Sequence, residues 1–147
     1  MSAVKIKIQR HAEDVVLPEY ATCGAAGMDI AAHIDTAVTL APFARAAIAT
    51  GFSMQLPHGY EAQIRPRSGL ALKHGVTVAN APGTIDSDYR GEVAVILINL
   101  SQQDFTITSG MRIAQMVIAP ITNCHLEDAS LLDISDRDTG GFGSTGL

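Results

Sequence analysis

N-A-P-G-T-I-D-S-D-Y-R-G-E-V, residues 80–93, separates two β-type runs, V-T-V at 76–78 and V-A-V-I-L-I at 93–98. Pro82-Gly83 is typical of a type II turn, because proline presets the φ of the first central position and glycine accepts the positive φ of the second. We therefore expect a hairpin-like excursion between two buried strands. The excursion carries a polar cluster formed by Asp86, Asp88, Tyr89, Arg90 and Glu92. Such a cluster is either ordinary turn chemistry on a solvated loop or part of a site.

Short β-type runs separated by Gly and Pro fill most of the remaining chain. Residues 4–8 alternate apolar and basic side chains, which predicts a half-buried edge strand protected by its lysines. Other strand-like runs, interrupted by turns and by a loop at 17–25, lie at 38–40, in short pieces of 44–56, and at 61–65, 102–109 and 110–118. Repeated strands at this spacing predict an all-β protein. Residues 93–98 are apolar on both faces, so we expect them to be buried on both sides or to lie against a neighbouring subunit.

Length, charge and cysteine content limit the classes of function. A chain of 147 residues fits a single domain, and its net charge of −5 without a basic run argues against a nucleic-acid partner. The N-terminus lacks the apolar stretch of a signal peptide, and the longest apolar run is too short to span a bilayer. We therefore expect no membrane partner and a cytoplasmic location. Cys23 and Cys124 are too few for a zinc site or a disulfide scaffold, so we expect both to be inert packing thiols.

Positive charge is concentrated in a few motifs. The arginines in or beside them are Arg65, Arg67, Arg90, Arg112 and Arg137. In P-R-S-G-L-A-L-K-H-G, residues 66–75, Ser68 is a good helix N-cap and Gly75 a good terminator, which predicts a short helix beginning at Ser68. A helix N-terminus beside Arg67 favours an anion such as phosphate, although Ser68 can also serve as a cap alone.

Two polar residues interrupt apolar runs. Asp29 lies in A-G-M-D-I-A-A at 26–32, where it either pairs with an arginine or backbone group or contacts a hydrated metal, and both roles are compatible. Gln115 lies in G-M-R-I-A-Q-M-V-I at 110–118, and alternation places its amide on the face of Met111, Ile113 and Val117. A buried amide without hydrogen bonds costs roughly 1–3 kcal/mol, so Gln115 is either a satisfied core residue or a ligand contact.

The chain ends R-D-T-G-G-F-G-S-T-G-L at 137–147. Glycine loses more backbone freedom on ordering than any other residue, so this tail is expected to be flexible until a ligand orders it. A disordered terminus is the alternative. The tail lacks the lysine and the strand-to-helix context of a P-loop, which excludes that class of phosphate site.

These five stretches, in this order, resemble the five motifs of the trimeric dUTPases. The match covers residues 26–147, with 26–32, 66–71, 83–92, 110–118 and 137–147 in the places of the motifs. The resemblance implies a distorted jelly roll of the β-clip type with one short helix, assembled as a homotrimer with sites shared between subunits. It also implies a single domain over 1–147 whose tail, 137–147, closes the site. Ala94 is smaller than the residue that would be expected to line a base pocket.

The resemblance further implies a chemical reaction and the roles of the site residues in it. dUTP would be hydrolysed to dUMP and pyrophosphate by in-line attack of water on the α-phosphorus, keeping uracil out of DNA and supplying dUMP for thymidylate synthesis. Asp86 would be the general base, and Mg²⁺ would bridge the phosphates with Asp29 touching it through water. The phosphate contacts would be Arg67, Ser68, Gly69, Gln115, Arg137, Ser144 and Thr145, and Gly143 would be a further substrate-binding residue. Uracil and deoxyribose would be held by Asn80, Gly83, Thr84, Ile85, Tyr89, Ala94 and Phe142.

Two other functions are compatible with the same motifs. A dCTP deaminase shares the fold and the triphosphate site but performs its chemistry on the base. A trimeric β-scaffold that binds nucleotide or protein without turnover is a non-enzymatic alternative. The D-S-D-Y turn and the Gly-rich tail favour the hydrolase over the deaminase, and the presence of Asp86 argues against a scaffold without activity.

Overall fold

The computed structural model describes residues 3–141, and in them antiparallel strands form three sheets. The four-stranded sheet has the order β1-β5-β9-β7, formed by Lys7–Arg10, Arg45–Gln55, Glu92–Asn99 and Val76–Val78. The five-stranded sheet has the order β2-β3-β11-β6-β8, formed by Glu19–Tyr20, Met28–Ala31, Arg112–Pro120, Tyr60–Arg65 and Gly83–Ile85. β10 (Phe105–Ile107) pairs with β4 (Val38–Leu40). The helix found in this part of the chain is α1, Ser68–His74, so the predicted all-β class with one short helix is confirmed.

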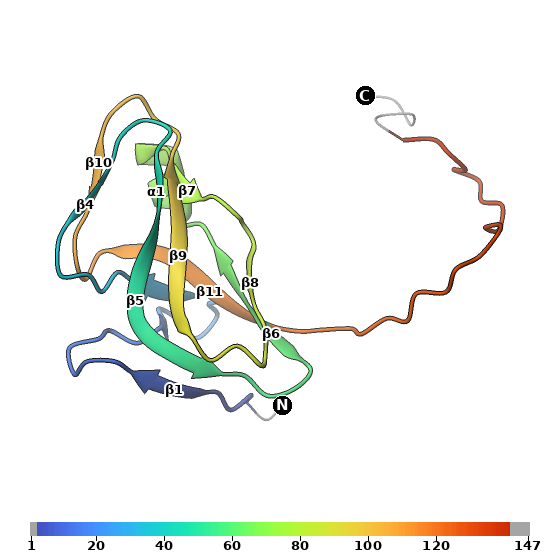
Figure 1. Cartoon of the computed structure of the whole chain (residues 1–147), viewed down its shortest axis with the longest axis horizontal. Coiled ribbons are helices and arrows are strands. Elements are labelled where there is room, and N and C mark those ends of the chain that lie inside the picture. The colour runs from blue at the N-terminus through green and yellow to red at the C-terminus, as the bar shows by residue number, and fades with distance from the viewer. Residues whose placement is uncertain (1–2, 142–147) are drawn as a thin grey trace.

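One hydrophobic cluster joins the two larger sheets. Ile48 and Val95 contribute to it from the four-stranded sheet, and Ile30, Ile64 and Met116 contribute from the five-stranded sheet. In Figure 1, β5 and β9 run side by side across the front and β11 crosses behind them. Two antiparallel sheets packed on a common core form the distorted jelly roll that the resemblance implies.

The excursion between β7 and β9 connects the two larger sheets. β7 and β9 are antiparallel neighbours, as the sequence predicts, but β8 leaves their sheet and pairs with β6. The prediction of a type II turn at Pro82-Gly83 is wrong. The Ala81-Pro82 peptide is cis, and Gly83 begins β8 without a positive φ. Glycine suits position 83 for a different reason, which is the lack of space for a side chain. A Cβ there would lie 3.1 Å from the Asn80 Nδ2 and 3.3 Å from the Ile64 Cβ.

Three further local predictions need correction. Residues 44–56 are mostly one long strand, β5, which bends where Gly51 has φ 74° and the register with β9 shifts. The expected loop at 17–25 contains the short strand β2. Ser68 is the first helical residue and not the cap; the N-cap position is Arg67, whose guanidinium has no acceptor for a cap bond and donates instead to Asp29. The prediction of Gly75 as terminator is confirmed by its left-handed φ of 65°.

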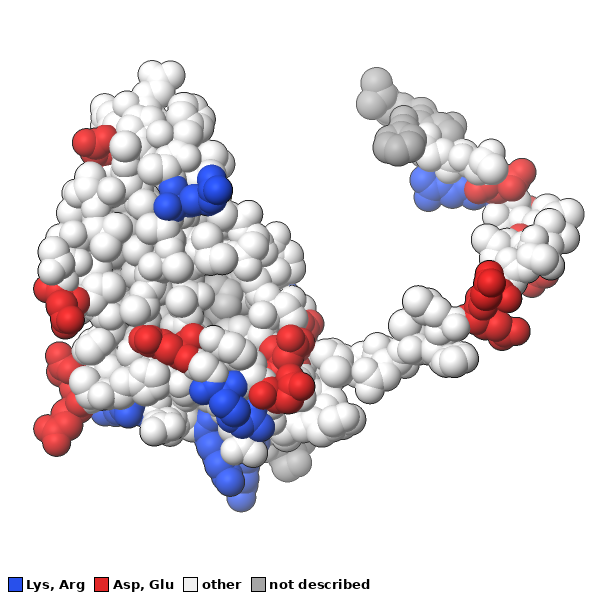
Figure 2. All heavy atoms as spheres, in the orientation of Figure 1, with Lys and Arg blue, Asp and Glu red and all other residues white. Residues whose placement is uncertain are grey.

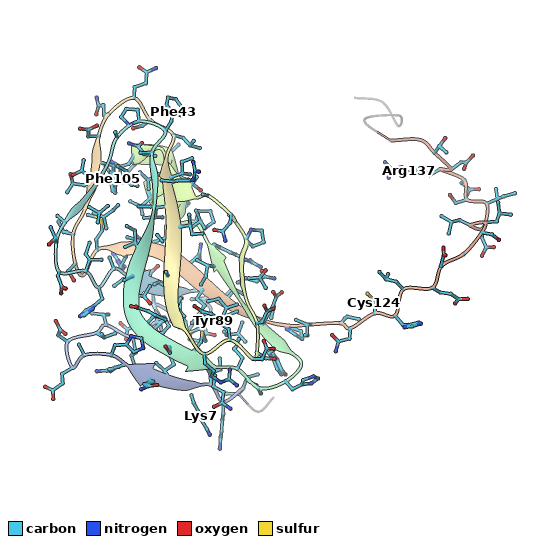
Figure 3. The ribbon with its side chains drawn as sticks, viewed as in Figure 1. Lys7, Phe43, Tyr89, Phe105, Cys124 and Arg137 are labelled. Carbon is cyan, nitrogen blue, oxygen red and sulfur yellow. The ribbon has the colours of Figure 1, made fainter. Side chains whose placement is uncertain are left out.

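Neither cysteine is a packing residue. Cys23 and Cys124 are both exposed, which overturns the prediction, because Cys23 lies in the loop before β3 and Cys124 lies beyond the last core strand (Figure 3). From Ile121 the chain leaves the body as an extended segment (Figure 1). Among residues 3–141, no helix has the length and hydropathy needed to cross a membrane.

β9 is buried on one face within the single chain. Val93, Val95 and Leu97 are buried, whereas Ala94 and Ile96 are exposed. Burial on both sides by the chain itself is therefore excluded, and coverage by a neighbouring subunit stays a prediction.

The buried Asn99 ties the end of β9 to two neighbouring segments. Its Nδ2 donates to the Leu40 carbonyl at 2.9 Å and the Gln103 carbonyl at 2.7 Å, and its Oδ1 accepts from the Ser101 N–H at 2.9 Å. We expect Asn99→Leu to lower the free energy of unfolding by about 2–4 kcal/mol, because each buried group that loses its partner costs about 1–3 kcal/mol. Urea unfolding at fixed protein concentration measures the loss. Gln102→Leu is the exposed control, and equal midpoints for both variants would contradict the role of Asn99.

Candidate active site

Asp29 on β3 holds two arginines from distant parts of the chain. The Arg67 Nε donates to one carboxylate oxygen at 3.0 Å, and the Arg112 guanidinium donates to the other at 3.0 Å. Arg67 also donates to the Arg112 carbonyl at 3.2 Å, which ties the start of α1 to β11. The arginine pairing predicted for Asp29 is thus confirmed. Two guanidiniums against one carboxylate leave an excess positive charge at this place, which suits an anionic ligand.

Gln115 lies beside this ion-pair cluster. It pairs with Asp29 on β3 and with Arg65 on β6, so the three residues form one row across the sheet. Its side-chain Nε2 donates to the Pro66 carbonyl at 3.0 Å. Gly27 leaves room for the amide, because a Cβ there would come within 3.2 Å of the Gln115 Cδ and closer still to Oε1. The amide is therefore held against the motif that contains Arg67.

The predicted face of Gln115 is partly wrong. A register shift lies between Arg112 and Ala114, so Ile113 and Ala114 are both buried and the simple alternation is broken. Gln115 is half-buried and does not share the buried face of its neighbour Met116. Its carbonyl oxygen makes no hydrogen bond among the described residues, which leaves an acceptor at the surface. Ser68 and Gly69 follow Arg67 and are exposed at the same end of the sheet.

Asp86 lies on a tightly held turn at another end of the molecule. The Tyr89 N–H donates to the Asp86 carbonyl at 3.2 Å, and the Arg90 guanidinium donates to the carbonyls of Ser87 and Tyr89 at 2.7 Å each. The Asp86 carboxylate is exposed. It borders an open hollow of about 440 Å³ lined by His58, Tyr60, Glu61, Asp86, Ser87, Asp88 and Ile121. Figure 2 shows charged side chains of both signs gathered at this end of the body.

Some of the residues expected to contact uracil can offer it only their backbone, and others can also offer a side chain. Gly83 and Ile85 are buried, so only their backbone is available to a ligand, whereas Thr84 is exposed. Asn80 is exposed and packs over Gly83. Ala94 lies on the exposed face of β9. Tyr89 is 46% exposed on the turn.

One chain does not bring Asp86 to the arginine cluster. Ile85 pairs with Ala62 on β6, and Gln115 pairs with Arg65 on the same strand. Asp86 therefore lies four residues, about 13 Å, along the strands from the Gln115 row, and about 10 Å across them because β6 separates β8 from β11. A single triphosphate group cannot easily span the two places, so the two halves of the predicted site are apart within the chain.

The tail residues are also apart from the rest. Figure 3 shows Tyr89 at the lower end of the body and Arg137 far along the extended segment. The Arg137 Nε donates to the Gly140 carbonyl at 2.8 Å, a contact within the tail itself. Phe142, Gly143, Ser144 and Thr145 lie outside the described residues. Their predicted contacts, and the flexibility predicted for 137–147, stay predictions.

Sequence reasoning missed two groups of the cluster. The sequence places Arg112 in a motif but assigns it no role, and no sequence pattern points to the Pro66 carbonyl. Arg112 is separated from Asp29 by 83 residues in sequence, so no local pattern signals their contact. Only the strand register, which pairs Arg112 of β11 with Ala31 of β3, shows that Arg112 lies close to Asp29.

The side chains at this site fit a divalent ion only if other groups supply most of its ligands. Among residues 3–141 no three His, Cys, Asp or Glu side chains are grouped as metal ligands. Both Asp29 oxygens already accept from guanidiniums, so direct coordination would compete with two charged donors. Mg²⁺ usually keeps several waters and binds through one or two carboxylates plus substrate phosphates. The site therefore suits an ion held mainly by phosphates and water, with Asp29 contacting a ligated water.

Comparisons with known proteins agree with these motifs. The family model described as dUTPase matches residues 13–146. Deoxyuridine 5'-triphosphate nucleotidohydrolase of Roseobacter denitrificans is 57% identical over 150 residues, covering 99% of this chain and 99% of the relative. The protein of the same name from Hydrogenobaculum sp. is 54% identical over 144 residues, covering 98% of this chain and 99% of the relative.

A solved structure shows the same fold. The dUTPase of Staphylococcus bacteriophage 80alpha with dUPNHPP has a TM-score of 0.87 at 25% identity, covering 97% of this chain and 99% of that one. A mutant dUTPase from phage phi11 of S. aureus, described with a structural Mg(II) ion, has a TM-score of 0.79 at 22% identity, covering 88% and 99%. With motifs, fold and near full-length relatives in agreement, this chain belongs to the dUTPase family.

Proposed function

We propose that this protein hydrolyses dUTP to dUMP and pyrophosphate, which removes a source of uracil in DNA and supplies dUMP for thymidylate synthesis. The observation that carries the proposal is the cluster of Asp29, Arg67, Arg112 and Gln115, which presents excess positive charge and a free amide oxygen beside the start of α1. Curated relatives above 50% identity carry the name of this activity. A cytoplasmic location belongs to the same proposal.

Asp86 is proposed to orient the attacking water and accept its proton. Its carboxylate is exposed on a turn that Arg90 holds by two hydrogen bonds, so its position is defined before substrate binds. Water then attacks the α-phosphorus in line, the bond to the β-phosphate oxygen breaks, and pyrophosphate leaves. A carboxylate suits this task because an attacking water beside a triphosphate needs a positioned acceptor more than a strong base.

The arginine cluster is proposed to hold the phosphate chain. Arg67, Ser68, Gly69 and Gln115 would contact it from the body, and Arg137, Gly143, Ser144 and Thr145 from the tail. A Mg²⁺ ion bound to the phosphates would supply charge neutralisation during bond breaking, with Asp29 touching it through water. Asp29 thus has two tasks, since it also fixes the direction of Arg67.

A homotrimer with shared sites is proposed from two observations. Asp86 and the Gln115 row are apart within one chain, so a second copy is needed to bring them to one triphosphate. The outer face of β9 and the neighbouring β5 exposes Ala47, Ala94 and Ile96, and Figure 2 shows the middle of this front face largely free of charge. An apolar sheet face of this kind is suited to contact between subunits.

Selection of the nucleoside is proposed to depend on the turn. The backbone of 83–85 and the Asn80 amide would pair with the polar edge of uracil and leave no room for a methyl group. Tyr89 would pack on the deoxyribose where a 2′-hydroxyl would collide, Ala94 would border the base, and Phe142 would close over it.

Tyr89→Ala is expected to lower the ratio of kcat/KM for dUTP over UTP at least about tenfold, because removing a steric contact in a pocket typically changes discrimination by tenfold or more. Steady-state rates with both nucleotides measure the ratio. Tyr20→Ala, at a tyrosine that is 53% exposed away from the turn, is the matched control. Equal loss of both rates with an unchanged ratio would make Tyr89 a packing residue only.

A pyrophosphate-release assay tests the function. Release from dUTP with formation of dUMP is expected, and no ammonia is expected from dCTP. Deamination of dCTP would instead identify a dCTP deaminase-like enzyme. Binding of dUTP without turnover would identify a non-enzymatic trimeric nucleotide-binding scaffold.

A further inference from the structure

The Tyr89 side chain is held by a hydrogen bond to a residue close to it in sequence. Its hydroxyl donates to the Glu92 carbonyl at 3.1 Å, so the ring folds back over the intervening residue, Gly91. The residue that provides the acceptor is itself anchored, because the Glu92 carboxylate accepts from the Gly51 N–H of β5 at 2.8 Å. The hydroxyl therefore binds a carbonyl that is fixed to the four-stranded sheet.

Gly91 has no side chain at the place where the Tyr89 ring lies. A Cβ at this position would come within 2.6 Å of the Tyr89 Cζ and 3.0 Å of Cε2, and closer still to the hydroxyl oxygen. The backbone does not require glycine here, because Gly91 is not among the residues with a positive φ. A methyl group at position 91 is thus compatible with the backbone but not with the observed position of the ring.

We infer that Gly91 is a positioning residue, which sets the sugar discrimination of the site by holding the Tyr89 ring in place. The inference rests on the proposed function, in which this ring packs on the deoxyribose. Because Glu92 is anchored to β5, the acceptor cannot follow a displaced hydroxyl, and a side chain at position 91 must rotate the ring and break its hydrogen bond. The ring then leaves the place from which it would exclude a 2′-hydroxyl.

The ring position is tested first, without substrate. The chain has three tyrosines, so ¹³C-tyrosine labelling yields few ring signals, and the Tyr89 signal is assigned by its absence in Tyr89→Ala. In Gly91→Ala the Tyr89 signal is expected to shift while those of Tyr20 and Tyr60 stay. Gly24→Ala is the matched control, since a Cβ there has no neighbour within 4 Å. An unchanged Tyr89 signal in folded Gly91→Ala overturns the inference.

Kinetics then test the consequence by a double-mutant cycle. Gly91→Ala is expected to lower the kcat/KM ratio of dUTP over UTP at least about tenfold, as a misplaced contact does, whereas Gly24→Ala leaves the ratio unchanged. In the Tyr89→Ala background the same Gly91→Ala change is expected to have no further effect on the ratio, because no ring remains to be displaced. Additive effects would overturn the inference, since they show that Gly91 acts by another route.

The outcomes separate this inference from the proposed function. A wild type that releases no pyrophosphate from dUTP overturns the function, and the discrimination role with it. A wild type that is active on dUTP, and whose Gly91→Ala variant keeps the ratio, overturns the inference alone.

Discussion

Asp86→Asn is expected to lower dUTP turnover at least about a hundredfold, the lower end of what a positioned general base contributes. The amide keeps the size and the hydrogen-bonding reach of the side chain, so the turn held by Arg90 stays intact. What is lost is the acceptor for the proton of the attacking water. Single-turnover rates of pyrophosphate release measure the effect on the chemical step.

Two controls separate chemistry from binding and folding. The Asp86→Asn variant is expected to bind a non-hydrolysable dUTP analogue with nearly the affinity of the wild type. Asp88→Asn removes an exposed carboxylate from the same turn and is expected to leave turnover close to normal. Near-normal turnover in a folded Asp86→Asn protein would remove Asp86 from the mechanism.

Mixed trimers are expected to regain activity that both parent proteins lack. One parent carries Asp86→Asn with an intact tail, and the other keeps Asp86 but ends at Asp136, before the tail at 137–147. If Asp86 of one chain and the tail of another meet in one site, each mixed ring of three has one junction with both intact parts. Random equal mixing places about three quarters of trimers in the mixed class, so roughly a quarter of all sites should recover.

The geometry of the chain motivates this experiment. Arg137 lies on a segment that leaves the body, and Asp86 and the arginine cluster lie apart within one chain (Figure 3). Subunit exchange is confirmed by native mass spectrometry before activity is measured. Should each tail fold over the Asp86 of its own chain, no pairing could restore a site, and mixed trimers would stay inactive.

Local chemistry in the sequence was enough to predict several parts of the fold and site. The edge strand predicted at residues 4–8 is found as β1, although at Lys7–Arg10, and Gly75 ends α1, because alternation and left-handed glycine act within a few residues. Local rules failed where a tertiary contact competes with them. The N-cap position is taken by Arg67, whose side chain binds Asp29 and caps nothing, and position 83 needs glycine because Asn80 and Ile64 crowd it.

The sequence by itself therefore determined the all-β class and the helix end, and the resemblance of its five motifs to those of the dUTPases indicated the family. Only the tertiary structure decided that Asp29 holds Arg112 from 83 residues away, that Gln115 reaches the Pro66 carbonyl, and that Asp86 lies apart from both. The physical reason is that strand register and bulges are set by the packing of two sheets on one core. Contacts between residues on different strands follow from that register. The register itself cannot be read from the sequence pattern of any single strand.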